Sequence, residues 1–111
     1  MTESGCKHGI LVSELATDPD MAELIEMFVD ELPDRVGAIE QTLTEQDFDT
    51  LKSLAHQLKG AAGGYGFPTI TDAAKAIEAT AKTTKDIEKL TKEVEFLTTL
   101  CRCARATPPR E

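Results

Sequence analysis

The stretch LKSLAHQLKGAAGGY, residues 51–65, spaces its apolar side chains three and four residues apart, as in an amphipathic helix. At roughly 100° per residue, one broad sector of that helix holds Leu51, Leu54, Ala55, Leu58, Ala62 and Tyr65. His56 points about 160° away from the middle of this sector, toward solvent. Its side of the helix also carries Lys52, Lys59, Gly60 and Gly63. A helix with one apolar stripe needs neighbours that cover the stripe, so the stretch predicts helix-on-helix packing.

Two helices are expected before this stretch. The Asp18–Pro19 pair is a helix-start signal, because Asp caps a helix and Pro fits its first position. The apolar positions that follow it are Met21, Leu24, Ile25, Phe28 and Leu32. Pro33 should interrupt this helix, and a second one should cover residues 36–46. Asp47 then predicts the N-cap of the helix that carries residues 51–65.

Two more helices are expected after the stretch. Gly66–Pro68 is a strong stop signal, and Thr69 and Asp72 have the spacing of a capping box. The next apolar stripe consists of Ile70, Ala73, Ala74, Ile77 and Ala81. A polar turn at residues 83–84 precedes the last stripe, which consists of Ile87, Leu90, Val94, Leu97 and Cys101. Short connections between amphipathic helices favour antiparallel neighbours, so the predicted fold is all-α, an antiparallel up-down bundle.

The length and net charge of the chain limit the number of domains and the kinds of partner that we expect. The chain has 111 residues, enough for one domain, and its 12 Lys and Arg against 20 Asp and Glu give a net charge of -8. This balance disfavours nucleic acid and anionic membrane surfaces as partners. No apolar run reaches the roughly 20 residues of a membrane span, so we expect a cytoplasmic protein. Residues 1–14 should form a tail with a short apolar segment, 15–105 the bundle and 106–111 a C-terminal tail.

The cysteines were considered as a metal site. Cys6, Cys101 and Cys103 are an odd set without a disulfide framework, which agrees with a reducing compartment. Together with His8 they offer four potential zinc ligands. Each pair has only one intervening residue, however, and residues two apart on a helix do not face one another. We therefore expect no metal ion, and we interpret Cys101 as a small core residue.

The exposed side of residues 51–65 has the composition of a nucleophilic site. A neutral imidazole in water is a nucleophile, and a nearby ammonium disfavours its protonation. Lys59 lies one turn beyond His56 and can pair with an attached phosphoryl group; Lys52, one turn before it, is the weaker candidate. Gly60 and Gly63 cost a helix roughly 1 kcal/mol each relative to Ala, which a partner's need for close approach would explain. Gln57 lies to one side and can hydrogen-bond a partner.

The run Ala55–Gly63, AHQLKGAAG, resembles the phosphorylation motif of histidine phosphotransfer (HPt) domains, and Ile77–Glu78 resembles the hydrophobic-Glu pair that the family often places in its next helix. The resemblance covers roughly residues 15–103. It implies a four-helix bundle with an additional N-terminal helical segment. It also implies that His56 is the phospho-acceptor, Lys59 the phosphate-stabilising cation and Gly60 the position that gives a partner clearance.

By the same resemblance, the chain is a phosphocarrier that has no kinase or phosphatase site of its own and needs no cofactor. Its partners would be receiver domains of response regulators or hybrid histidine kinases, which bring the metal ion and the acceptor aspartate. A monomer is the default expectation. Carboxylates on the helix faces, Glu78 among them, are expected to be ordinary solvated or capping residues. The alternative is a helical adaptor that never carries phosphate, in which His56 is an ordinary surface residue.

Overall fold

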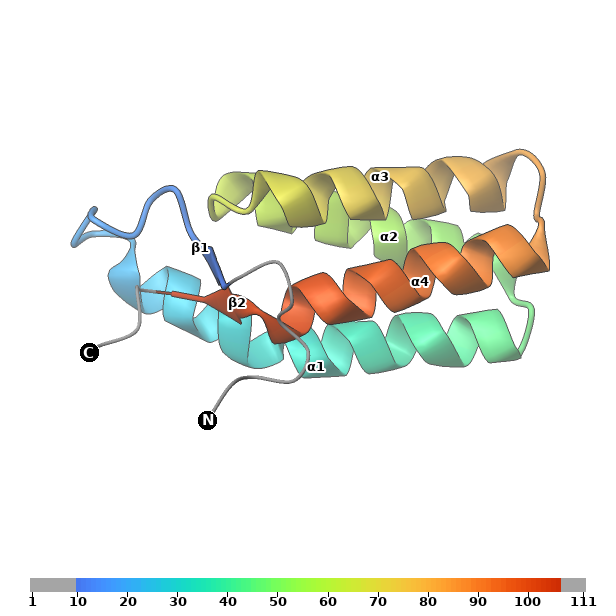
Figure 1. Cartoon of the computed structure of the whole chain (residues 1–111), viewed down its shortest axis with the longest axis horizontal. Coiled ribbons are helices and arrows are strands. Elements are labelled where there is room, and N and C mark those ends of the chain that lie inside the picture. The colour runs from blue at the N-terminus through green and yellow to red at the C-terminus, as the bar shows by residue number, and fades with distance from the viewer. Residues whose placement is uncertain (1–9, 107–111) are drawn as a thin grey trace.

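A computed structural model describes residues 10–106 of the chain. Most of this part is helical, and the helices lie side by side along the long axis of the molecule (Figure 1). The elements in chain order are β1 (Leu11–Val12), α1 (Ala22–Thr44), α2 (Phe48–Gly64), α3 (Pro68–Lys82), α4 (Ile87–Arg102) and β2 (Ala104–Arg105).

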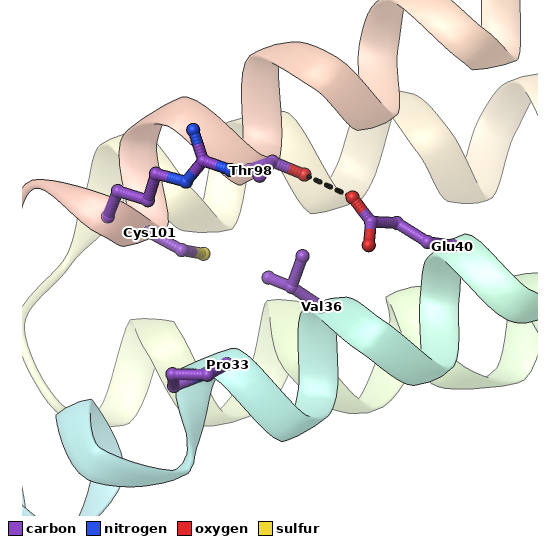
Figure 2. A pocket seen from close by; sticks show the side chains of 6 residues that line it. Pro33, Val36, Glu40, Thr98 and Cys101 are labelled. Carbon is purple, nitrogen blue, oxygen red and sulfur yellow. Dashed lines mark hydrogen bonds between the residues drawn. The ribbon is translucent and has the colours of Figure 1, made fainter. Parts of the chain in front are cut away.

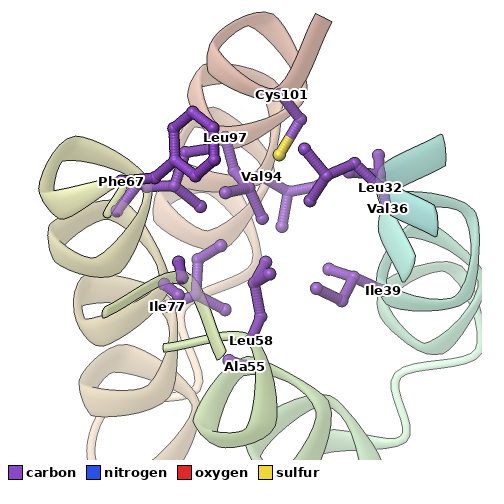
Figure 3. Packing of buried hydrophobic residues seen from close by; sticks show 14 of the residues in the cluster. Leu32, Val36, Ile39, Ala55, Leu58, Phe67, Ile77, Val94, Leu97 and Cys101 are labelled. Atoms are coloured by element: carbon purple, nitrogen blue, oxygen red, sulfur yellow. The ribbon is translucent and has the colours of Figure 1, made fainter. Parts of the chain in front are cut away.

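The helices form the predicted four-helix bundle. Helices α1 and α3 each pack against both α2 and α4. The connections are three residues from α1 to α2, three from α2 to α3 and four from α3 to α4, so consecutive helices run in opposite directions (Figure 1). All four apolar stripes meet in one core, where Leu58, Ile77 and Leu97 approach one another from different helices (Figure 3). The prediction of an all-α bundle is confirmed.

Helix α1 corrects the prediction that Pro33 separates two helices. The helix runs through Pro33 without a break. Pro33 is exposed, whereas Leu32 and Val36 on either side of it are buried in the core. Burial of these two side chains offsets the backbone hydrogen bond that a proline removes, a cost of about 3 kcal/mol. The predicted additional N-terminal helical segment is therefore not a separate element, because residues 22–32 are the first half of α1.

Helix α1 also begins later than the Asp18–Pro19 pair predicts. Asp18 and Pro19 lie in a run of turns, and the helix begins at Ala22. The Asp18 carboxylate accepts a hydrogen bond from the backbone N–H of Asp20, so it caps a turn instead of the helix.

The segment before α1 lies at one end of the bundle, where the short strand β1 is followed mostly by turns (Figure 1). Strand β1 pairs in parallel with β2, which directly follows α4. Ser13 is buried; its hydroxyl donates to the Tyr65 carbonyl at 2.6 Å, and the Glu14 N–H donates to the Gly66 carbonyl at 2.8 Å. Gly66 has φ +86°, and a Cβ added there would lie 2.5 Å from the Ser13 hydroxyl. The α2–α3 turn therefore requires glycine both for its backbone conformation and for this close approach.

The capping residues predicted for the N-terminal ends of α2 and α3 are observed for α2 but not for α3. Asp47 caps α2 as predicted, since its carboxylate accepts from the Thr50 N–H at 3.2 Å. The predicted capping box of Thr69 and Asp72 is wrong, because Pro68 already occupies the first turn of α3 and no side chain caps that helix.

Candidate functional site

His56 lies near the middle of α2 with its side chain in solvent. The side chain is 65% exposed, whereas Ala55 and Leu58 are buried in the core. The Asp47 cap and this buried stripe fix the rotation of α2 about its axis. The predicted orientation of His56 toward solvent is therefore confirmed.

Glu78 of α3 joins His56 and Lys59 into one network. Its Oε2 lies 2.9 Å from Nδ1 of His56, and its Oε1 lies 2.8 Å from Nζ of Lys59. The Glu78 side chain is 21% exposed and that of Lys59 is 30% exposed, so both are partly shielded while the imidazole projects outward. One carboxylate thus orients the two groups on α2 that the sequence singled out.

The network determines which ring nitrogen of His56 is available. The Lys59 ammonium, and secondarily the hydrogen bond with His56, hold the pKa of Glu78 below its ordinary value against the opposing effect of desolvation. An ionised carboxylate only accepts hydrogen bonds, so Nδ1 must carry the proton. In the neutral ring, Nε2 then holds the free lone pair on the exposed side chain.

Glu78 is the site residue that the sequence interpretation missed. The Ile77–Glu78 pair was noticed, but the carboxylate was interpreted as an ordinary solvated or capping group. Its partners lie 22 and 19 positions earlier in the chain, and its reach depends on how α2 and α3 pack together. The available signal was the position of Glu78 directly after the buried Ile77, at the edge of the core-facing stripe of α3.

The glycines of α2 leave open space beside His56. A Cβ added at Gly60 or Gly64 would have nothing within 4 Å, and one at Gly63 would meet only the Thr71 hydroxyl at 3.5 Å, an ordinary contact. All three are exposed and lie within the helix. The packing of this chain therefore does not account for glycine at these positions, in contrast to Gly66.

Lys52 and Gln57 lie outside the network. Within the described part of the chain, no hydrogen bond or ion pair joins Lys52 to His56, Lys59 or Glu78. Gln57 is exposed, and its side-chain contact with Ser53 is long, at 3.5 Å. Both stay candidates by position alone.

Two of the four potential zinc ligands, Cys101 and Cys103, lie in the described part of the chain. Cys101 is a buried free thiol whose pKa burial raises to about 12. Cys103 is disulfide-bonded, so the expectation of three reduced thiols is wrong for Cys103. Cys6 and His8 lie outside the described residues, and residues 10–106 contain no cluster of His, Cys, Asp or Glu suited to a metal ion.

A hollow between α1 and α4 is lined by none of the residues of the His56 network. It has a volume of about 220 Å³ and lies beside Pro33, Val36 and Cys101, with Thr98 donating a hydrogen bond to Glu40 at 3.3 Å across it (Figure 2). The Cys101 sulfur points between the two helices, but its high pKa leaves almost no thiolate at neutral pH. This hollow therefore offers no chemistry comparable to that of His56.

Comparison with models of protein families gives a match over most of the chain. The family model described as Hpt domain matches residues 23–106, a span that includes all four helices except the first residue of α1. Neither the curated proteins nor the solved structures contain a significant match to this chain. None of the described helices is long and apolar enough to cross a membrane.

Proposed function

Because the chain belongs to the Hpt domain family, whose members carry phosphoryl groups between receiver domains in phosphorelays, we propose that His56 is its phospho-acceptor. It takes the group from the phospho-aspartate of one receiver domain and passes it to the aspartate of another. The observation that carries this proposal is the network at His56: an exposed imidazole whose Nδ1 is engaged by an ionised carboxylate and whose Nε2 faces outward.

The transfer is a direct displacement at phosphorus. The Nε2 lone pair forms the N–P bond as the P–O bond to the donor aspartate breaks, and that aspartate leaves as a carboxylate. The ring then has a phosphoryl group on Nε2 and a proton on Nδ1, so it gains positive charge. Glu78 lies 2.9 Å from this nitrogen and stabilises that charge; it also holds the ring in the required tautomer. The return step to the second aspartate reverses these changes.

Lys59 acts on the phosphoryl group in this proposal. In the unphosphorylated chain its ammonium is held at 2.8 Å from Glu78, one helical turn from His56. A phosphoryl group on Nε2 brings three acceptor oxygens and additional negative charge close to that turn. We expect the ammonium to move toward these oxygens, which stabilises the phosphorylated form.

Phosphorylation by a labelled phospho-receiver domain tests the acceptor. The label should be lost in acid, survive base and be absent from His56→Gln, which keeps the fold because the side chain is 65% exposed. Gly37→Ala is the matched control, since it changes an exposed residue on α1 that has no proposed role and should still accept label. Labelling of folded His56→Gln would contradict the assignment. A folded parent protein that accepts no label from a broad panel of receivers would favour the adaptor alternative.

The remaining parts of the proposal concern the oligomeric state of the protein, its location and its lack of enzymatic activity. We propose that the chain acts as a monomeric phosphocarrier in the cytoplasm, without its own kinase or phosphatase activity. The net charge of -8 supports protein partners over nucleic acids or anionic membranes. Activity assays with ATP alone test the absence of kinase activity, because no label should then appear on the protein.

A further inference from the structure

A groove between α3 and α4 lies on the side of α3 that faces away from the His56 network. Glu78 extends from α3 to His56 and Lys59 on α2. Thr80, two residues later, points to the other neighbour and donates a hydrogen bond to Glu93 of α4 at 3.1 Å. Helices α3 and α4 lie side by side in the bundle (Figure 1). A partner seated in this groove therefore approaches a different side of α3 from one that reaches His56.

The groove has an apolar floor and an exposed aromatic ring. Its volume is about 330 Å³, and its lining residues are Thr69, Asp72, Ala73, Ala76, Glu93 and Phe96. Phe96 is 53% exposed, although most large apolar side chains of the described helices are buried. Exposed aromatic rings next to a hollow are typical of surfaces that bind other proteins.

The charged groups of the groove are both carboxylates. Asp72 on α3 and Glu93 on α4 are the charged residues among those that line it. Glu93 Oε2 accepts from Thr80, whereas Glu93 Oε1 has no hydrogen-bond partner among the described residues although it is shielded from water. Such an oxygen gains most from a cationic donor, because leaving it unpaired has a free-energy cost.

The negative charge of the groove favours a cationic partner segment over a second copy of this chain. A second copy of this chain would bring further carboxylates to the groove, and each chain has a net charge of -8. A cationic segment would instead meet complementary charge. We propose that the α3–α4 groove docks a basic, amphipathic segment of a partner protein. Its apolar side chains would contact Phe96 and Ala76, and a guanidinium or ammonium would pair with Glu93 and Asp72.

This docking surface goes beyond phosphoryl transfer, because it adds a contact that does not use His56. A protein bound in the groove could remain attached while a receiver domain reaches the imidazole. Such an attachment would raise the local concentration of a tethered partner without altering the transfer chemistry.

The test uses nuclear magnetic resonance on the isotope-labelled full chain. The probe is a 15-residue helical peptide of Leu, Ala and Arg, with Leu on one face and Arg along its border. We expect its addition to shift the amide resonances of Ala73, Ala76 and Phe96. Phe96→Ser should weaken binding by about tenfold and Glu93→Gln by about threefold. Met27→Ser is the matched control, since Met27 is 55% exposed on α1 and should leave the affinity unchanged.

Four patterns of resonance shift or peptide affinity would overturn the proposal. The first is a set of shifts centred on α1 or on His56, and the second is equal affinity of Phe96→Ser and Met27→Ser. The third is equal binding of a peptide with Glu in place of Arg. The fourth is a concentration-dependent shift of the groove amides without peptide, which would assign the groove to a second copy of the chain.

Phosphoryl transfer to Phe96→Ser separates this proposal from the function of His56. The groove faces away from the imidazole, so the transfer rate should equal that of the parent protein. A slower transfer in this folded variant would show that the groove belongs to the receiver-binding surface, and would overturn a separate docking role. Failure of the peptide to bind, with normal transfer, would overturn the docking proposal alone.

Discussion

Replacing Gly60 by Ala should stabilise the bundle and slow phosphoryl transfer. Gly60 is exposed in the interior of α2, and an added Cβ would have no atom within 4 Å. The substitution therefore introduces no clash within the chain and removes the entropic penalty of a helical glycine, about 0.8–1 kcal/mol. For a domain of about 100 residues, this gain corresponds to a rise of roughly 4–8 °C in the melting temperature.

The effect on transfer has the opposite sign if Gly60 provides clearance for a receiver domain. Gly60 follows His56 by one helical turn, so its missing side chain opens the surface that a partner must approach to reach Nε2. Forcing an extra methyl group into a well-packed contact costs about 1–3 kcal/mol, which corresponds to a decrease in rate of roughly 5- to 150-fold. A larger side chain, as in Gly60→Leu, should decrease the rate further.

Gly37 provides the matched control for both measurements. It is an exposed helical glycine on α1 whose added Cβ would also meet nothing within 4 Å. Gly37→Ala should raise the melting temperature by a similar amount and leave transfer unchanged. Thermal unfolding by circular dichroism gives the stability, and transfer from a labelled phospho-receiver gives the rate. Equal transfer rates for Gly60→Leu and Gly37→Leu would refute the clearance argument.

Four further predictions concern other parts of the molecule. Glu78→Gln should slow transfer by about tenfold, because a neutral amide replaces a charge-assisted hydrogen bond to Nδ1; Gly37→Ala is the control. The lowered pKa of Glu78 means that its ionised form stabilises the fold fully above the reference value of 4.5. The stability difference between parent and Glu78→Gln in urea should therefore shrink as the pH falls below 4.5 and through the lowered pKa of Glu78. Gly66→Ala should lower the free energy of unfolding by more than the roughly 1–2 kcal/mol of a left-handed backbone, because its Cβ would also lie 2.5 Å from the Ser13 hydroxyl; a urea midpoint equal to that of the parent would contradict the structure. Cys101 should resist iodoacetamide at pH 8 until the protein is unfolded, since burial raises the pKa of its thiol to about 12; alkylation of the folded protein at the rate of a free thiol would count against this environment.

Much of the bundle could be predicted because its helices have apolar stripes at regular spacing. The stripe of residues 51–65 predicted both the buried Leu58 and the exposed His56, and both are observed. Asp47 could be recognised as a cap because its carboxylate bonds to an N–H only three residues away. These features depend on interactions within a single helix, or on one helix facing a core of any composition.

The errors occur where tertiary contacts override a local signal. Pro33 is a helix breaker by intrinsic preference, yet Leu32 and Val36 are both buried and hold α1 together across it. Strands β1 and β2 are two residues each and come from opposite ends of the described chain, so no local pattern marks their pairing. Such contacts depend on how distant segments are arranged, which periodicity does not describe.

The network at His56 also depends on contacts between segments that are distant in the sequence, and the proposed chemistry depends on this network. Glu78 reaches His56 and Lys59 only because α3 lies close to α2 in the observed register, which Thr71 reinforces by donating to the Lys59 carbonyl at 3.3 Å. Buried alanines such as Ala62 and Ala74 allow this close approach. In the proposed function, the motif on α2 supplies the nucleophile, whereas the tautomer that leaves the Nε2 lone pair free depends on the packing of α3. The phosphoryl-transfer activity of this chain should therefore be sensitive to substitutions in the α2–α3 interface that leave every residue of the motif unchanged.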